Sequence, residues 1–448
     1  MKTNARESVL DILLTLEKEH IFSNKLIKET LDRQDSLEYR DKAFIKRMAE
    51  GTIERQIELD YYLNRVSKVP VAKMKPLIRC LLRMSAYQLL YMDAVPDSAV
   101  CNEACKLAEK RGFYRLKGFV NGVLRNLAKQ KDRLPLPEKG EGAEFYSVKY
   151  SMPQWLVEMW ISQYGEEDTE TMLEGLLRIH PVSLRFRGDL PEEETEALLG
   201  RMKEAGALVT QSGVHPLVYR VSNIDGVDSL PGYGEGAFMV QDVSSVQAVE
   251  AAQIKEGDFV MDICAAPGGK SVFAAEKAGR TGRVLARDVS KEKIARIKEN
   301  IERMKASNIS IQMFDAGVWD EGYREKADVL LADVPCSGLG VMGKKRDIKY
   351  HVTRESLGEI VDLQKRIITN SWQYVKPGGI LLYSTCTIHR GENEDMVDWI
   401  VENFPFEKEV SVQILPGITE ADGFFYARLR RKKFESKLSN SSLVDAGV

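Results

Sequence analysis

Two cysteines stand where a reactive thiol would be useful. Cys336 follows Asp333-Val334-Pro335, Cys386 follows Ser384-Thr385, and each comes soon after an apolar run of strand type. A thiolate can attack a carbon atom and form a covalent intermediate, so this placement predicts covalent catalysis. Free cysteines are also common as small buried apolar residues. Two of them at the ends of strands make that interpretation the weaker one.

A run of small residues forms a second candidate site: Cys264-Ala265-Ala266-Pro267-Gly268-Gly269-Lys270. It follows a buried strand pattern and precedes a helical one, so on its own it also fits an ordinary strand-to-helix turn. Small residues let a ligand approach the backbone, and the helix start would face that ligand with free N–H groups. The run matches neither the dinucleotide nor the triphosphate glycine pattern. It therefore favours a nucleoside ligand with a compact polar tail, a description that S-adenosylmethionine fits.

Aspartates end three further strand patterns of the same half. Asp288 lies 20 positions after Gly268, where a sheet of this type holds ribose hydroxyls, and Asp315 and Asp333 end the next two patterns. A single aspartate at a strand end is often a helix cap, but several in register favour a binding edge. Five strand patterns together predict a Rossmann-like α/β sheet with its ligands beyond the carboxyl ends of the strands: 258–261, 282–286, 309–314, 327–332 and 379–384.

Three motifs together resemble the signature set of RNA cytosine-C5 methyltransferases. They are Asp-x-Cys-Ala-Ala-Pro-Gly-Gly-Lys from Asp262, Asp-Val-Pro-Cys-Ser-Gly from Asp333, and Ser-Thr-Cys-Thr from Ser384. With the N-terminal half described below, the chain resembles the bacterial 16S rRNA methyltransferase family RsmB, also called Sun or Fmu, over nearly its full length.

The chain departs from the family pattern at a few positions. Arg346 stands where the family usually has a proline before Asp-Ile-Lys, and Ser271 and Thr387 replace the commoner Thr and Ser. None of these changes removes a reactive group. The basic residues Lys344, Lys345, Arg346 and Lys349 follow the Pro-Cys motif, and we expect them to hold phosphates of the substrate RNA.

The resemblance implies methyl transfer to C5 of cytosine. This carbon is not nucleophilic until a thiolate has added to C6, and the family assigns that attack to Cys386 and the release of product to Cys336. DNA cytosine methyltransferases use the Pro-Cys position as nucleophile, so the residues alone do not decide which of the two cysteines attacks C6. Asp333 would hydrogen-bond the cytosine ring, and Lys270 would orient the base or lower a thiolate pKa. As a residue at a helix start, Lys270 is equally well explained as solvent-facing.

The resemblance also implies which residues at this edge of the sheet bind each part of the cofactor, S-adenosylmethionine. The turn would wrap its methionine part, Asp288 would bind the ribose, Asp315 the adenine amino group, and Asp333 would complete the site; the turn residues are Cys264, Ala265, Ala266, Pro267, Gly268, Gly269 and Lys270. We expect no metal, because Cys101 and Cys105 lie four positions apart without a second pair or a His at ligand spacing. These two are expected to be buried helix thiols.

The net charge of −3 hides an asymmetry between the two ends of the chain. Residues 1–130 contain 24 Lys or Arg and 17 Asp or Glu, a net charge of +7, so the remainder carries −10. Two stretches, 61–92 and 110–131, hold six and seven basic residues and no acidic one. Such clusters favour a polyanion partner, although a charge run is more usually a solvated helix face. With aromatic residues interleaved, RNA binding is the better interpretation.

The N-terminal region reads as helical throughout. Apolar residues recur at helical spacing in 9–16, 44–53, 77–84 and 119–127, which predicts an all-α bundle. Its details resemble the NusB-like RNA-binding domain of the same family. We therefore expect a NusB-like domain over 1–132, a small α+β domain over 145–235, a Rossmann-like methyltransferase domain over 236–434 and a disordered tail over 435–448.

The composition is that of a globular protein without a membrane anchor. No apolar run approaches the roughly 20 residues that span a bilayer, and the first residues lack a signal-peptide core, so a cytoplasmic location is expected. The six cysteines are expected to be reduced. The predicted substrate is a single-stranded or locally opened segment of 16S rRNA, with no protein partner required. Alternatives are another RNA such as tRNA, DNA, or an RNA-binding factor whose transferase half is silent.

Overall fold

A computed structural model describes residues 4–19, 21–33, 37–178 and 181–433, and its contacts divide the chain into two compact units. Unit 1 comprises 1–180, 337–356 and 415–419, whereas unit 2 comprises 181–336, 357–414 and 420–448. The tail expected at 435–448 lies outside the described residues. Within the described ranges, no helix is long and apolar enough to cross a membrane.

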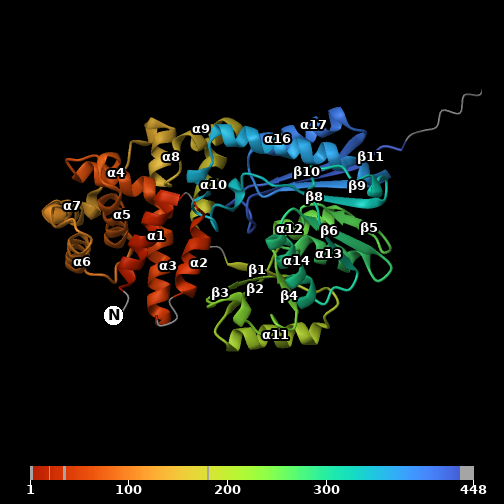
Figure 1. The fold of residues 1–448 in the computed structure, drawn as a ribbon, viewed down its shortest axis with the longest axis horizontal. Coiled ribbons are helices and arrows are strands. Elements are labelled where there is room, and N and C mark those ends of the chain that lie inside the picture. The colour runs from red at the N-terminus through yellow and green to blue at the C-terminus, as the bar shows by residue number, and fades with distance from the viewer. Residues whose placement is uncertain (1–3, 20, 34–36, 179–180, 434–448) are drawn as a thin grey trace, which may run out of the picture. The chain divides into compact units, whose positions relative to one another are not determined.

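Unit 1 begins with a bundle of helices, which confirms the all-α prediction (Figure 1). Helix α5 is its centre, because it packs against α1, α3, α4, α6 and α7. Pro76 starts α5, where a missing N–H costs nothing. The helices are α1 (Ala5–Glu19), α2 (Ser23–Asp32), α3 (Tyr39–Glu54), α4 (Gln56–Val66), α5 (Pro76–Tyr91), α6 (Asp97–Lys110) and α7 (Lys117–Gln130).

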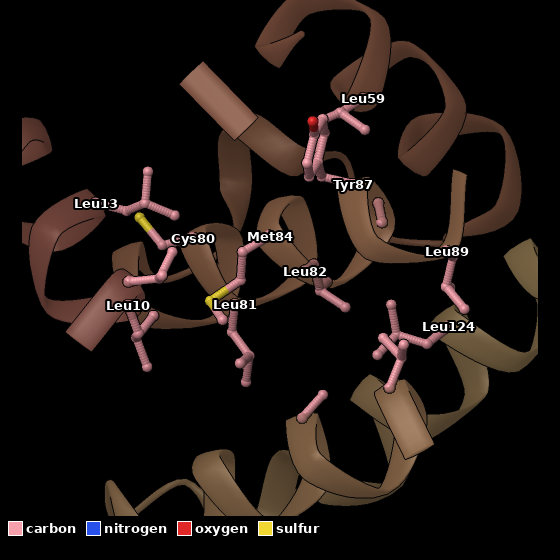
Figure 2. Close-up of a cluster of buried hydrophobic side chains, with 14 of the residues drawn as sticks. Leu10, Leu13, Leu59, Cys80, Leu81, Leu82, Met84, Tyr87, Leu89 and Leu124 are labelled. Carbon is pink, nitrogen blue, oxygen red and sulfur yellow. The ribbon is translucent and has the colours of Figure 1, made fainter. Parts of the chain in front are cut away.

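The bundle core consists of aliphatic side chains at helical spacing. Figure 2 shows Leu10 and Leu13 of α1 and Leu124 of α7 beside residues of α5, among them Leu81 and Leu82. Leu10, Leu81, Leu82 and Leu124 are fully buried. Cys101 is buried in this core, and Cys105 is also buried.

Unit 1 also contains three helices that follow the bundle in the chain: α8 (Ala143–Lys149), α9 (Gln154–Tyr164) and α10 (Glu166–Leu177). Helix α8 is too short for a periodic pattern in the sequence to reveal it. Trp160 of α9 is fully buried. The residues expected as one middle domain, 145–235, are divided between the units: α8, α9 and α10 lie in unit 1, and the strands and the helix after residue 181 lie in unit 2.

Unit 2 contains a small antiparallel sheet of order β2-β3-β1-β4. Its elements are β1 (Val182–Phe186), α11 (Glu192–Glu204), β2 (Leu208–Gln211), β3 (Val218–Ser222) and β4 (Phe238–Val240). Arg185 of β1 is fully buried, forms paired bonds of 2.7 and 2.9 Å with Glu276 of α13 (Gly269–Ala278), and lies over the Phe273 ring. This ion pair joins the small sheet to α13, a helix that covers the larger sheet.

The larger sheet has the order β10-β11-β9-β8-β5-β6-β7 and confirms the Rossmann-like prediction. The five strands from β9 to β7 are parallel. Strands β6 and β7 lie on one side of β5, and β8 and β9 lie on the other, so the strand order reverses at β5, which is where ligands bind in such sheets. The strands are β5 (Phe259–Asp262), β6 (Arg283–Asp288), β7 (Ile309–Met313), β8 (Ala327–Asp333), β9 (Val375–Thr385), β10 (Phe406–Ile414) and β11 (Phe424–Arg431).

Helices cover both faces of this sheet (Figure 1). Met261 and Leu330 pack toward α16 (Arg354–Ser371) and α17 (Glu394–Asn403), whereas Val260 and Val329 pack toward α12 (Val243–Ala251) and α13. Helix α14 (Lys291–Arg303) packs beside β6 and β7, and the short α15 (Ile348–His351) belongs to unit 1. Burial on both faces explains the near-continuous apolar runs of the central strands.

Replacing Leu81 with Ala should destabilise unit 1 by roughly 2–5 kcal/mol, because a fully buried side chain at the centre of α5 leaves a cavity. Urea unfolding followed by helical circular dichroism measures the change. The control Val69→Ala, at a position 38% exposed in the same unit, should change stability by less than about 0.5 kcal/mol. Equal effects of the two substitutions would contradict this core.

Candidate active site

The small-residue turn lies between β5 and α13, as predicted. Gly268 caps α13 with a φ of 106°, a left-handed backbone that other residues rarely adopt. The turn lines a pocket of about 170 Å³ with Asp333, and its opposite wall comes from Val240, Gln241, Asp242 and Ser245. A small pocket between a glycine turn and a helix start suits the amino-acid end of S-adenosylmethionine.

All four residues of this wall were absent from the predicted site. Asp242 is the N-cap of α12 and accepts hydrogen bonds from Ser244 N at 3.1 Å and Ser244 Oγ at 2.7 Å. The run from Phe238 to Ser245 reads in the sequence as a strand followed by a helix, but nothing in that pattern assigns Gln241, Asp242 or Ser245 to a pocket.

Asp288 lies against the turn, at the end of β6. Its Oδ2 accepts a hydrogen bond from Ala266 N at 3.0 Å, its Oδ1 accepts one from Val289 N at 2.8 Å, and Lys293 Nζ lies 3.0 Å from Oδ1. The carboxylate is therefore fixed where β6 meets the turn. Asp315 is exposed beyond the edge strand β7 and accepts a hydrogen bond from Gly317 N at 2.8 Å.

The two candidate cysteines come together at the neighbouring strand ends. Strands β8 and β9 pair in parallel with Asp333 opposite Ser384, so the loops that follow them begin side by side. Cys336 Sγ and Cys386 Sγ lie 3.1 Å apart, and both residues are partly exposed. The hydrogen bond to Cys386, burial, and the negative charges of Cys386, Glu392 and Asp333 raise the pKa of Cys336. Cys336 is therefore held as a thiol.

Asp333 connects the cysteine loops to the turn. Its Oδ2 accepts a hydrogen bond from Lys270 Nζ at 2.7 Å, and its Oδ1 accepts one from Ser384 Oγ at 2.8 Å. Burial alone would lower the pKa of Lys270, but the charge and hydrogen bond of Asp333 outweigh it and the pKa is raised. With a side chain only 13% exposed, Lys270 is an inward-facing ammonium rather than a solvated helix-start lysine.

A further carboxyl lies beneath the turn. Asp262 Oδ2 accepts a hydrogen bond from Ser271 Oγ at 2.6 Å, and Asp262 Oδ1 has no hydrogen-bond partner among the described residues. Burial raises the pKa of Asp262 to about 7. The sequence motif contains Asp262. An aspartate at this position can either support the turn or contact a ligand, and the sequence does not distinguish these two roles.

Buried polar side chains fix the two cysteine loops from behind. Gln364 Nε2 donates to Pro335 O at 2.9 Å, next to Cys336. Asn393 accepts a hydrogen bond from Thr385 Oγ1 at 2.6 Å and donates one to Thr387 O at 3.1 Å, on either side of Cys386. Neither Gln364 nor Asn393 was predicted, because a polar residue in a helix or loop carries no motif of its own.

The basic residues after the Pro-Cys motif do not all face solvent, which corrects the expectation that they hold phosphates. Arg346 forms ion pairs with Glu50 and Glu54 inside unit 1, and Lys349 is buried there. Lys344 and Lys345 are exposed. Among the described residues, no group of three or more His, Cys, Asp or Glu side chains is placed to hold a metal ion.

The two basic stretches of the bundle are also partly neutralised by acids from elsewhere in the chain. Arg79 pairs with Glu17, Arg83 with Asp60, and Lys110 with Glu7. Exposed basic residues remain in both stretches: Arg65, Lys68, Lys73, Lys75, Arg115, Arg125 and Lys129.

Comparison with known proteins agrees with these motifs. The model of the 16S rRNA methyltransferase RsmB/F family matches residues 249–430, and that of the NusB family matches residues 3–129. The probable ribosomal RNA small subunit methyltransferase B of Bacillus subtilis (strain 168) is 32% identical over 460 aligned positions, which cover 96% of this chain and 99% of that protein. The ribosomal RNA small subunit methyltransferase B of Proteus mirabilis (strain HI4320) is 30% identical, with 89% and 92% covered.

Solved structures show the same architecture. PH0851 superposes with a TM-score of 0.78 at 25% identity and covers 96% of this chain and 99% of its own. NSun6 from Pyrococcus horikoshii with SFG has a TM-score of 0.54 at 20% identity and covers 63% of this chain and 99% of its own, a likeness of fold. The chain therefore belongs to the S-adenosylmethionine-dependent 16S rRNA methyltransferase RsmB/F family and carries a NusB-family region at its N-terminal end.

Proposed function

We propose that the protein methylates C5 of a cytosine in 16S rRNA through a covalent bond between Cys386 and C6. The observation that carries the proposal is the pair of sulfur atoms 3.1 Å apart, beside the ion pair of Lys270 with Asp333. C5 methylation needs one thiol to add to the ring and a second group to assist its release. Methylation of a nitrogen or an oxygen gives no reason for two thiols at this edge.

In the first half of the proposed reaction, the Cys386 thiolate adds to C6. The C6–S bond forms, and the electron pair of the C5–C6 double bond becomes available at C5. Asp333 accepts a hydrogen bond from the cytosine amino group, and the Lys270 ammonium offsets negative charge that develops on the ring. S-adenosylmethionine, when bound, supplies the methyl group that C5 takes.

In the second half, the C5 proton is lost to solvent and its electron pair restores the double bond while the C6–S bond breaks. The Cys336 thiol donates a hydrogen bond to the departing Cys386 sulfur and so stabilises the thiolate. The raised pKa of Cys336 suits this role, because a thiolate there would repel the leaving one. This assigns the nucleophile to Cys386 and the assistance of elimination to Cys336.

The proposal also assigns a role to each part of the chain. The NusB-like region, 1–132, would bind rRNA through its exposed basic residues, 145–235 would support that contact, and 236–434 would perform the transfer. The target base must leave any helical stack to reach the strand ends, so a single-stranded or opened segment is the substrate. No protein partner is required by this scheme.

Three other functions have less support. A cytosine in another RNA such as tRNA would use the same residues, and the names of the relatives favour rRNA. An RNA-binding factor with a silent transferase half would need neither the paired thiols nor the Lys270–Asp333 contact. The names of these relatives give no support to a DNA substrate.

Cofactor binding should depend on Asp288. Asp288→Ala removes a charged acceptor at the ribose position and should weaken S-adenosylmethionine binding by at least ~1 kcal/mol, about fivefold, in titration calorimetry. Asp398→Ala, at an exposed carboxylate on α17, is the control and should bind normally. Unchanged affinity in Asp288→Ala would refute this ribose site.

RNA affinity should depend on the exposed lysines of the bundle. Replacing Lys68, Lys73 and Lys75 by Gln should weaken rRNA binding and reduce the slope of log affinity against log salt by roughly 0.7 to 0.9 for each phosphate that the protein no longer neutralises. Filter binding between about 50 and 200 mM salt measures both the affinity and the slope. Lys408→Gln, which removes an exposed ion pair with Asp398 in unit 2, is the control. An unchanged slope would indicate that the bundle serves packing and not RNA binding.

Substitution of each of the two cysteines should block a different step of the reaction. Cys386→Ala should form neither a covalent RNA adduct nor product. Cys336→Ala should still attack and methylate, but slow elimination should make a methylated protein–RNA species accumulate. Denaturing electrophoresis with labelled RNA and labelled methyl donor distinguishes the two. The reverse result, an adduct in Cys386→Ala and none in Cys336→Ala, would assign the nucleophile to Cys336.

A further inference from the structure

Asp315 lies in a loop of unit 2 that follows the edge strand β7, and the family resemblance assigns to it the adenine amino group of S-adenosylmethionine. We call residues 314–323 the Asp315 loop. The carboxylate is exposed, and its Oδ1 accepts a hydrogen bond from Gly317 N in the same loop at 2.8 Å. Because this bond is local, the place of the carboxylate is determined by how the whole loop is held.

Arg287 of β6 reaches the Asp315 loop from within the sheet. Its side chain is only 1% exposed. Successive side chains of a strand point to opposite faces, so Arg287 faces away from its neighbour Asp288. Its Nη2 lies 2.5 Å from Asp320 Oδ2, and its Nε donates to Gln312 Oε1 at 2.9 Å. Arg287 therefore bonds both to β7 and to the loop that follows it.

Two aromatic rings pack on the Arg287 guanidinium. Its Cζ lies 4.3 Å from the centre of the Phe314 ring and 4.4 Å from the centre of the Tyr323 ring. Both distances are within the roughly 6 Å at which a cation is attracted to the face of a ring. Phe314 and Tyr323 are the first and last residues of the Asp315 loop. One buried guanidinium thus contacts both ends of this loop.

Asp320, the ion-pair partner of Arg287, also fixes the backbone of the loop. Its Oδ1 accepts a hydrogen bond from Gly322 N at 3.0 Å, and its own N–H donates to the Tyr374 hydroxyl at 3.0 Å. The Trp319 ring stacks on the Tyr374 ring, with centres 5.2 Å apart and planes 8° from parallel. Tyr374 is 1% exposed, so these contacts tie the loop to the core of unit 2.

The chemistry of Arg287 suits a fixed support. A charge withdrawn from water is costly unless it is paired and hydrogen-bonded, and the Asp320 and Gln312 contacts supply that compensation. A guanidinium is planar, so it can stack on rings while its edge donates hydrogen bonds, and a lysine ammonium cannot do both. Its buried contacts are to the protein itself, which leaves the neighbouring Asp288 to serve the ligand.

We infer that Arg287 is a positioning residue for adenine recognition, because it holds the loop that carries Asp315. Two adjacent residues of β6 would then serve two parts of one cofactor, Asp288 the ribose directly and Arg287 the adenine through the loop. The inference rests on the placement of S-adenosylmethionine at these strand ends, and it does not depend on the chemistry of the two cysteines.

The inference predicts a preference for one purine base over another. The 6-amino group of adenine can donate a hydrogen bond to the Asp315 carboxylate. Hypoxanthine presents an oxygen at the same position, which a carboxylate repels. The ratio of the affinities for the two bases therefore reports where the Asp315 carboxylate lies, whereas a general loss of stability would weaken the binding of both.

The test measures the binding of S-adenosylhomocysteine and S-inosylhomocysteine by titration calorimetry. The wild type should bind the adenine compound at least about tenfold more tightly, and Arg287→Gln should reduce this ratio to about threefold or less. Asp320→Asn weakens the same ion pair at a side chain that is 23% exposed. It should give an intermediate ratio, and it remains informative if Arg287→Gln folds poorly.

Arg283→Gln is the matched control, because Arg283 is exposed and lies four residues earlier on the same face of β6. It should keep the wild-type ratio. Asp315→Ala should abolish the preference for adenine. Adding Arg287→Gln to Asp315→Ala should not change the ratio further, because the two residues act through one contact and their effects are not additive.

Two results would overturn the inference and leave the adenine site in place. One is a wild-type ratio in both Arg287→Gln and Asp320→Asn while Asp315→Ala loses the preference. The other is an equal effect of Arg287→Gln with and without Asp315. If the wild type shows no preference, or if Asp315→Ala keeps it, the adenine placement fails and the inference fails with it. Adduct formation by Cys386 is measured separately, so failure of the proposed methyl transfer remains distinguishable.

Discussion

The ion pair between Lys270 and Asp333 is the contact on which the site depends. Lys270 lies in the first turn of α13, after the small-residue turn, and Asp333 ends the strand before Cys336, so one bond of 2.7 Å connects this turn to the loop that carries Cys336. Both groups are largely withdrawn from water, with side chains 13% and 28% exposed. Loss of either one would leave the other charge without compensation, a change that costs several kcal/mol when a pair is buried.

Around this pair, the parallel sheet determines which residues meet. Strand β5 supplies the turn, β6 ends at Asp288, and β8 and β9 pair so that Asp333 faces Ser384. The order of these strands places residues that are more than 100 positions apart in the chain at one edge. Behind them, Gln364 and Asn393 direct their hydrogen bonds to the loops that carry the thiols. Rigid support of this kind is what a covalent mechanism requires.

The sequence predicted the five parallel strands of the larger sheet because each is a short apolar run that ends in a distinctive residue, but it did not predict the antiparallel strands β10 and β11. It predicted the helices of the bundle because their apolar stripes keep helical spacing. It did not predict α8, which is too short, or the pocket wall from Gln241 to Ser245, whose position depends on tertiary contacts. The acid partners of Arg79, Arg83 and Arg346 come from distant segments, so a basic run in the sequence overstated the charge available to RNA.

The most direct measurement is bisulfite sequencing of 16S rRNA, which distinguishes 5-methylcytosine from cytosine at each position. RNA from cells that contain the protein should show one protected cytosine. That protection should be absent from cells without the gene and from cells that carry Cys386→Ala, and it should return with the unmodified chain. An identical pattern of protected cytosines in all four samples would contradict cytosine-C5 methylation of 16S rRNA by this protein.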